Sequence, residues 1–232
     1  MEERLLRSYS LAIASVILVC SLNLVAQTNP PEHKPPYPAH WWSEISSIGA
    51  PSWEVLPQRA NYNEVILSKR NELGLLSNFA ATPFTYRAKK YASVEGFWQS
   101  LKYPENKEDS RNQLGKLKWP HTRQQVEQMT AFEAKDAGNL GSDNMKTLGI
   151  DWVSFEGKHL VYKEKGESPF YWLIVEVMRA KMDQNPEVKK LLLQTDSLIL
   201  MPDHDSGPVE LRAWQYHRIW MQFRNKLKAN KY

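Results

Sequence analysis

The chain has 232 residues, of which 42% are hydrophobic and 24% are charged. This length and composition are typical of a soluble protein with one sizeable core, and the length favours one domain over two. The net charge of +4 and the isoelectric point near 9.0 suit an anionic ligand such as a phosphate ester. The lysines and arginines are scattered and not massed in one block, so the composition does not indicate a nucleic-acid-binding protein.

The first 26 residues have the pattern of a signal peptide. The stretch from Leu11 to Ala26 is apolar, is shorter than the ~20 residues of a membrane-spanning helix, and ends in a small residue. We expect cleavage after residues 1–26 and a periplasmic or secreted protein with no stable membrane domain. The alternatives are a membrane anchor at residues 8–26 and a buried N-terminal helix. The only cysteine, Cys20, lies in this segment, so its removal excludes a disulfide framework, a zinc–thiolate site and a cysteine nucleophile.

Residues 27–60 form a proline-rich segment that includes the stretch NPPEHKPPYP. Because proline fixes φ and lacks a backbone donor, we expect an extended linker and a loosely structured arm. The arm carries Trp41, Trp42 and Trp53, which we expect to pack on the domain that follows. The alternative is that the arm is a peptide ligand for a partner protein.

Residues 61–228 carry the patterns of a folded domain. The runs NEVILS and PFTYRAKKYAS predict a small sheet or a hairpin. Ser168 as N-cap, Pro169 as first helical residue and a stripe of apolar side chains predict a core helix that stops before Pro186. PEVKKLLLQ predicts another short helix, SLILM a buried strand, and ELRAWQYHRIWMQFRNKLK a C-terminal helix. The expected fold is therefore mainly α (α+β), a single compact multihelical domain with a small β-sheet or hairpin.

The stretch SVEGFWQSLKY, residues 93–103, raises the question of a binding site. If Ser93 caps a helix, steps of about 100° bring Glu95, Gln99 and Lys102 into an arc of roughly 60°. The ends of this polar stripe are about 10 Å apart along the axis, which could span a ribose and its phosphate. The alternative is an ordinary solvated helix face.

Several motifs, in order, resemble those of the NADAR family, which is also known through riboflavin-intermediate N-glycosidases. They are NELGLLSNFAATPF, YASVEGFWQSLKY, AKDAGNLG with GIDW, and VMRAKMDQNPEVKKLLLQT. The resemblance implies a mainly helical fold and hydrolysis of an N-glycosidic bond without a cofactor. The implied substrates are a ribosylamino-pyrimidine phosphate of riboflavin synthesis or a conjugate of ADP-ribose with a guanine base. Nucleic acid is implied only as an ADP-ribosylated substrate.

The resemblance places the family's Glu-x-x-x-Gln-x-x-Lys helix on Glu95, Gln99 and Lys102. Cleaving an N-ribosyl bond builds positive charge on the anomeric carbon, so a nearby carboxylate stabilises the transition state more than the ground state. Glu95 is the candidate for this carboxylate. We expect the helix N-terminus to favour its charged form, and Lys102 to neutralise a phosphate.

The family's Ser-Asn-Phe turn corresponds to Ser77, Asn78 and Phe79, its Asp-Trp tryptophan to Trp152, and the lysine of its later helix to Lys181. The resemblance implies that Trp152 stacks on the base or ribose in the catalytic centre, that Asn78 binds sugar hydroxyls and that Lys181 meets phosphate. The ordinary alternatives are a core tryptophan, a turn-forming asparagine and a surface lysine.

The sequence departs from the commonest family pattern in the stretch TDSLILMPDHDSGPVELRAW, where an expected glutamate is missing. Asp203 or Asp205 is the candidate second carboxylate, and position in the motif favours Asp203 as catalytic and Asp205 as substrate-binding. A metal site at Asp203, His204 and Asp205 is disfavoured because adjacent residues rarely aim at one ion. The altered loop leaves open a second function, a non-catalytic module that binds ADP-ribose or nucleotides.

Overall fold

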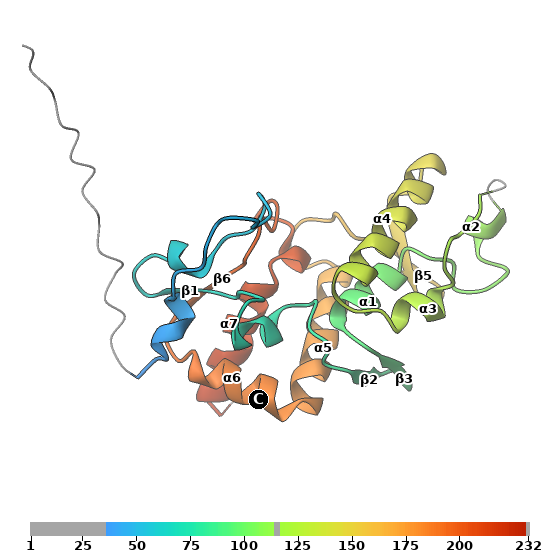
Figure 1. Ribbon diagram of the computed structural model, residues 1–232. Helices are drawn as coiled ribbons and strands as arrows, with labels where there is room; N and C mark the ends of the chain where they lie inside the picture. The colour runs from blue at the N-terminus through green and yellow to red at the C-terminus, as the bar shows by residue number, and fades with distance from the viewer. Residues whose placement is uncertain (1–35, 114–116, 231–232) are drawn as a thin grey trace, which may run out of the picture. The chain divides into compact units, whose positions relative to one another are not determined.

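The computed structural model describes residues 36–113 and 117–230 (Figure 1). The predicted signal peptide at 1–26 and the start of the predicted arm lie outside the described residues. In the part of the chain that is described, no helix has both the length and the hydropathy needed to cross a membrane.

A two-stranded parallel sheet joins distant parts of the chain. Strand β1 (Glu64–Ile66) pairs with β6 (Ile199–Met201), with Val65 opposite Leu200. Both strands were predicted, but the sequence did not predict that they pair with each other. Helix α7 (Tyr216–Lys228) packs on β6 and on α6 (Pro186–Gln194), so this sheet and these helices form one part of the core.

The central helix α5 (Pro169–Gln184) begins and ends as its sequence predicts. The Ser168 hydroxyl accepts a hydrogen bond from the Tyr171 backbone N–H, Pro169 occupies the first turn, and the helix ends before Pro186. An antiparallel hairpin of β2 (Phe84–Tyr86) and β3 (Lys89–Tyr91) packs against α5. This hairpin confirms the sheet predicted for PFTYRAKKYAS.

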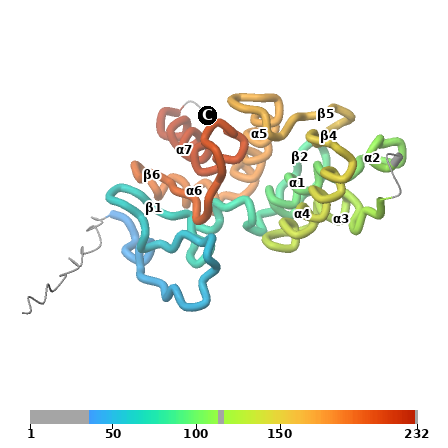
Figure 2. The backbone as a smooth tube through the Cα atoms, turned by 90° about the horizontal axis from the view of Figure 1, so that it is seen from above, coloured from blue at the N-terminus to red at the C-terminus, as the bar shows by residue number. Residues whose placement is uncertain are grey.

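A second group of helices contains α1 (Val94–Ser100), α2 (Ser110–Gln113), α3 (Arg123–Glu127) and α4 (Ala131–Thr147), of which α3 and α4 pack against α1. The hairpin of β4 (Trp152–Phe155) and β5 (Lys158–Val161) follows this group in the chain. Figures 1 and 2 agree in placing α1, α3 and α4 together and α6 and α7 beside β1 and β6. A large hydrophobic cluster includes buried residues from both groups, and α1 contacts α5 directly.

Glycines allow α1 to lie unusually close to its neighbours. A Cβ at Gly96 would come within 2.4 Å of the Met129 carbonyl oxygen, which follows α3. A Cβ at Gly141 of α4 would lie 3.2 Å from the Lys102 Cβ. Side chains at these positions would push the helices apart, and the polar residues of α1 would move with them.

The described part of the proline-rich arm is packed against the domain and belongs to the same compact unit. Trp41 and Trp42, in the 3-10 helix η1 (Ala39–Trp42), are buried in the main hydrophobic cluster. The Trp41 indole N–H donates to Glu72 Oε1 at 2.6 Å, and that of Trp42 donates to the Glu64 carbonyl at 2.8 Å. A buried indole needs such a partner, so both rings are fixed in place. A second 3-10 helix, η2 (Pro57–Arg59), closes the arm.

The fold class predicted from the sequence is confirmed. Over residues 36–113 and 117–230 the fold is α+β, with helices predominating and three separate two-stranded sheets. One boundary was wrong: the C-terminal helix was expected from residue 210, but α7 begins at Tyr216 after a separate 3-10 turn, η4 (Arg212–Trp214). Another 3-10 turn, η3 (Glu72–Leu76), leads to the Ser-Asn-Phe turn.

Candidate functional site

A cavity of about 950 Å³ lies between α1, α4, the Ser-Asn-Phe turn and the loop that follows β6. Its volume is at the upper end of the range of about 300–1,000 Å³ that is common for small-molecule sites. The lining residues with polar or charged side chains include Lys69, Ser77, Asn78, Glu95, Gln99, Lys102, Lys135, Asn139, Ser142, Asp143, Lys146, Asp151, Lys163, His204, Asp205 and Ser206. The aromatic lining residues are Trp53, Phe79, Trp98, Phe132, Tyr162, Phe170, Trp214 and Tyr216.

Glu95 lies in the first turn of α1, on the cavity wall, with a side chain that is only 7% exposed. The helix begins where the sequence predicts, because the Ser93 hydroxyl accepts a hydrogen bond from the Gly96 N–H at 2.9 Å. The same hydroxyl donates to the Met129 carbonyl, and the Glu95 backbone N–H donates to the Asn78 carbonyl at 2.9 Å. The start of α1 is therefore tied to two neighbouring segments.

Gln99 holds the Glu95 carboxylate in position. Its side-chain N–H donates to Glu95 Oε1 at 2.7 Å, one helical turn away. Its amide presses against α4 so closely that a Cβ at Gly138 would lie 1.7 Å from Gln99 Oε1. Glycine at residue 138 is therefore required for this arrangement. The Asn78 Oδ1 atom is buried and has no hydrogen-bond partner among the described residues, so a donor from a ligand or water would stabilise it.

Burial raises the pKa of Glu95 above its ordinary value, although the hydrogen bond from Gln99 and the charge of Lys102 oppose this shift. The sequence had suggested the opposite, a charged form favoured by the helix N-terminus. The net shift has the other direction because the loss of hydration on burial is its largest cause. A carboxylate of this kind is a stronger base than an exposed one whenever it is ionised.

Lys102 lies just after the end of α1 and also lines the cavity. Its ammonium donates to Ser142 Oγ at 2.8 Å and to the Gly138 carbonyl at 3.1 Å, and lies 5.6 Å from the Trp98 ring centroid. Burial lowers the pKa of Lys102 to about 8, and the charge of Glu95 partly opposes this. The structure thus brings the three residues of the predicted polar stripe together on one cavity wall. It also adds Trp98 to this wall.

The Ser-Asn-Phe turn lines the cavity with all three of its residues. Lys181 does not line the cavity but lies behind this turn, fully buried, with its ammonium donating to the Ser77 carbonyl at 2.7 Å. Burial lowers the pKa of Lys181 to about 7. This position supports the turn, whereas the sequence had suggested direct contact with a phosphate.

The two candidate aspartates of the altered loop point to different places. Asp203 is 1% exposed and is absent from the cavity wall. Both of its carboxylate oxygens accept from the Lys69 ammonium, at 2.7 Å for Oδ1, and His204 Nδ1 lies 2.8 Å from the same Oδ1. Although burial alone would raise the pKa of Asp203, these partners lower it below its ordinary value. Asp205 lines the cavity, and its Oδ1 accepts from the Gly207 N–H.

Trp152 is not brought to the cavity. Its ring stacks on His159 with a centroid distance of 3.4 Å, and the Arg111 guanidinium lies 5.0 Å from its centroid. The structure thus gives no support to the predicted stacking on a base or ribose. The tryptophan holds the β4–β5 hairpin to the segment after α1 instead.

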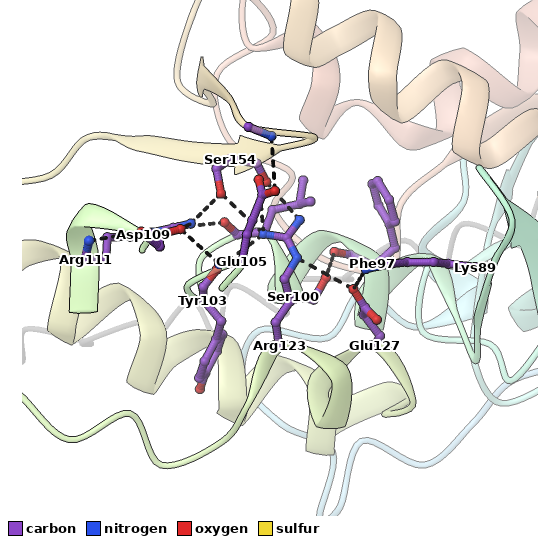
Figure 3. A network of polar contacts seen from close by, with 12 residues as sticks. Lys89, Phe97, Ser100, Tyr103, Glu105, Asp109, Arg111, Arg123, Glu127 and Ser154 are labelled. Carbon is purple, nitrogen blue, oxygen red and sulfur yellow. Dashed lines mark hydrogen bonds and ion pairs between the residues drawn. The ribbon is translucent and has the colours of Figure 1, made fainter. Parts of the chain in front are cut away.

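A buried network of ion pairs and hydrogen bonds fixes this region (Figure 3). Arg111 is fully buried, pairs with Asp109 and donates to the Leu101 carbonyl at 2.9 Å. Arg123 donates to the Ser154 carbonyl at 2.9 Å and lies within ion-pair distance of two glutamates. Because its charges are paired, this network supports the end of α1 and is not itself a candidate ligand site.

Lysines exceed acidic residues around the cavity. Five lysines line it, at positions 69, 102, 135, 146 and 163, together with four acidic residues, at positions 95, 143, 151 and 205. This balance suits a ligand that carries an anionic group. Among the described residues, no three His, Cys, Asp or Glu side chains converge as they would around a metal ion.

The sequence did not predict Lys69, His204 or Trp53 as parts of the site. They come from three separate segments and belong to none of the motifs that drew attention to α1. In the stretch DHD the sequence drew attention to His204 only through a metal site that its spacing disfavours. His204 instead stacks on Tyr216, with 6.0 Å between the ring centroids.

No family model and no curated protein matches the chain. A search of solved structures finds the NMR structure of the Escherichia coli protein YbiA, with 21% sequence identity and a TM-score of 0.41. The match covers 75% of this chain and 93% of the YbiA chain. At this TM-score the likeness assigns neither a family nor an activity.

Proposed function

We propose that this chain is a hydrolase that cleaves the N-glycosidic bond between a ribose and a nucleobase-type nitrogen. The observation that carries the proposal is the buried Glu95 carboxylate on the wall of a cavity of about 950 Å³, with the buried ammonium of Lys102 on the same wall. The resemblance of the motifs to the NADAR family supports the same reaction. The candidate substrates are a ribosylamino-pyrimidine phosphate and an ADP-ribosyl-guanosine-like conjugate, and a nucleic acid is a substrate only if it is ADP-ribosylated.

In the proposed reaction, the bond between C1′ of the ribose and the nitrogen breaks, and its electron pair stays on the nitrogen. Positive charge develops on C1′, where the ionised Glu95 carboxylate stabilises it. A water oxygen bonds to C1′ and gives one proton to Glu95, which releases it to bulk water, and the leaving nitrogen takes up one proton from bulk water, so the net reaction consumes one water molecule. We assign Asp205 to orienting this water, because Asp205 lines the cavity whereas Asp203 is paired with Lys69.

The other cavity residues bind the two ends of the substrate. Asn78 has a buried acceptor that a sugar hydroxyl would satisfy. Lys102 is assigned to the phosphate, and the Trp98 ring beside it to the ribose or base. Lys181 acts indirectly by holding the Ser77 carbonyl and, with it, the turn that carries Asn78.

The expected export remains part of the proposal. A leader at residues 1–26 would place the reaction outside the cytoplasm, and an uncleaved anchor at residues 8–26 would place it at a membrane surface. N-terminal sequencing of the mature protein distinguishes the two, because cleavage would leave Gln27 as the first residue.

The test is a turnover assay with purified protein and each candidate substrate, in which the released base and sugar are identified by mass spectrometry. The wild-type protein should release both products, and Glu95→Gln should be slower by about 10²- to 10⁴-fold, the usual contribution of a general base. The matched control is Glu133→Gln, which makes the same chemical change at an exposed carboxylate outside the cavity. Activity that Glu95→Gln leaves intact would remove Glu95 from the mechanism.

One observation favours the alternative, a non-catalytic module that binds ADP-ribose or nucleotides. Asp203, the acid that the motif favours, is buried, forms an ion pair with Lys69 and does not line the cavity. Tight ligand binding without turnover, in the wild type as well as in Glu95→Gln, would establish this alternative.

A further inference from the structure

Three aromatic rings gather at the exposed edge of the cavity, although they come from distant segments. Trp53 belongs to the arm, Phe79 to the Ser-Asn-Phe turn and Phe132 to the first turn of α4. The centroid of Phe132 lies 6.0 Å from that of Trp53 and 5.3 Å from that of Phe79. Trp53 is 45% exposed and Phe132 is 48% exposed, so two large rings of this cluster face solvent beside a polar cavity. A cluster of this kind marks a binding surface more often than isolated exposed rings do.

The arm holds Trp53 firmly in this place. The next residue, Glu54, forms a two-pronged ion pair with Arg70, with 2.6 Å between Arg70 Nε and Glu54 Oε1. The Val55 N–H donates to the Asp203 carbonyl at 2.8 Å. Two anchored residues thus follow the tryptophan directly. This part of the arm is already ordered, so ligand binding would cost little conformational entropy there.

A cation lies between two of the rings. The Lys69 ammonium is 5.8 Å from the Trp53 ring centroid and 4.9 Å from that of Phe79. Asp203 fixes this ammonium through its carboxylate, and its backbone carbonyl also anchors the arm. The buried aspartate therefore positions both the cation and the aromatic ring, which gives it a role other than catalysis.

We propose that Trp53, Phe79 and Phe132 form a second ring-binding subsite, in which the arm stacks on a planar heteroaromatic ring of the ligand beside the Lys69 ammonium that Asp203 holds in place. The inference rests on the proposed function in so far as the ligand is nucleotide-like. It adds that residues before the predicted domain boundary at 61 determine which ligands bind. Base–aromatic stacking at one ring typically changes affinity by about five- to a hundredfold.

The test compares two probes by isothermal titration calorimetry with the full chain. AMP carries a purine ring and a phosphate, whereas ribose 5-phosphate lacks the ring. Trp53→Ala should weaken AMP binding by about five- to a hundredfold and leave ribose 5-phosphate binding unchanged, and Trp53→Phe should restore most of the AMP affinity. The control is Trp172→Ala, because Trp172 is 48% exposed on α5 and does not line the cavity.

The remaining outcomes would each overturn the proposal. Equal loss of affinity for both probes in Trp53→Ala would show that the tryptophan only supports the arm. Unchanged AMP affinity, or no AMP binding to the wild-type protein, would show that the cluster is not a ring-binding subsite. Phe132→Ala provides a second variant if Trp53→Ala does not fold. These binding results do not depend on turnover, so AMP affinity that falls in Trp53→Ala while the wild type shows no turnover would contradict the proposed reaction and leave this inference standing.

Discussion

Replacing Lys181 with methionine should flatten the dependence of stability on pH above neutrality. Lys181 is fully buried on α5, and the one described hydrogen bond of its ammonium goes to the Ser77 carbonyl. Among the described residues, no acidic side chain lies within ion-pair distance of this ammonium. Burial lowers its pKa from 10.5 to about 7. Methionine is of similar length and carries no charge.

The sign of the effect follows from the two pKa values. Below pH 7 both the folded and the unfolded chain carry the proton, so folding must bury a charge. Between pH 7 and pH 10.5 only the unfolded chain carries it, so the free energy of unfolding rises with pH in this window. The contribution of Lys181 to the free energy of unfolding is therefore fully present above its pKa in the unfolded chain. It is lost as the pH falls through its pKa in the folded chain. A difference of this size corresponds to about 5 kcal/mol at most.

The assay is urea denaturation at several pH values from about pH 6 to about pH 10, followed by tryptophan fluorescence. The free energy of unfolding of the wild type should rise relative to that of Lys181→Met across this range. Other groups that titrate in the window, such as Lys102, do so in both proteins and cancel in the comparison. The variant also leaves the Ser77 carbonyl without its donor, which costs about 1–3 kcal/mol at every pH.

Lys190→Met serves as the matched control, because Lys190 is exposed on α6. Its stability curve should run parallel to that of the wild type. If the curve of Lys181→Met also runs parallel to that of the wild type, Lys181 keeps its ordinary pKa in the folded chain, and the reasoning from burial is refuted.

Three further predictions concern the site and its support. Gly138→Ala should slow N-glycoside turnover at least about tenfold, because the new Cβ would displace Gln99 from the Glu95 carboxylate. Unchanged turnover in a variant with an unchanged melting temperature would contradict this prediction. Lys102→Arg should keep its affinity for ribose 5-phosphate above pH 8, where the wild type loses its positive charge, and calorimetry at rising pH should show the two proteins diverging. Trp152→Phe should lower the free energy of unfolding by about 1 kcal/mol through weaker stacking, while AMP affinity stays the same, since Trp152 lies outside the cavity.

Local signals predicted α5 and α6 well because helix ends are determined by nearby residues, whereas α3 and α4 were not predicted. Ser168, Pro169 and Pro186 act through backbone geometry and hydrogen bonds within a few positions, and the structure uses them as expected. The start of α7 was not predictable in this way. Gln215 leaves the helical conformation, and its side-chain amide donates to the carbonyl groups of residues 206–208, a contact with the loop after β6 that sequence spacing does not encode.

The pairing of β1 with β6 could not be predicted from the sequence either. The runs around Val65 and Leu200 each have the composition of a buried strand, but period and composition do not specify a partner 135 positions away. Parallel pairing over such a separation depends on how the intervening helices pack.

The candidate site was predictable where it lies on one helix and not where segments meet. The spacing of Glu95, Gln99 and Lys102 placed them on one face, and the structure puts that face on the cavity wall. Nothing in the sequence decides which of Asp203 and Asp205 faces the cavity, because that choice depends on the backbone path of the loop between them.

The burial of Trp41 and Trp42 has a practical consequence for any shortened version of this protein. A fragment that starts at residue 61 would remove two indole rings from the interior and leave Glu72 without the donor from Trp41. Loss of one large aromatic side chain from a core typically costs about 3–5 kcal/mol, which is a large fraction of the about 5–15 kcal/mol by which native domains are stable. The folded domain that carries the cavity therefore depends on the N-terminal segment, and we expect the smallest fragment that folds to begin upstream of Trp41.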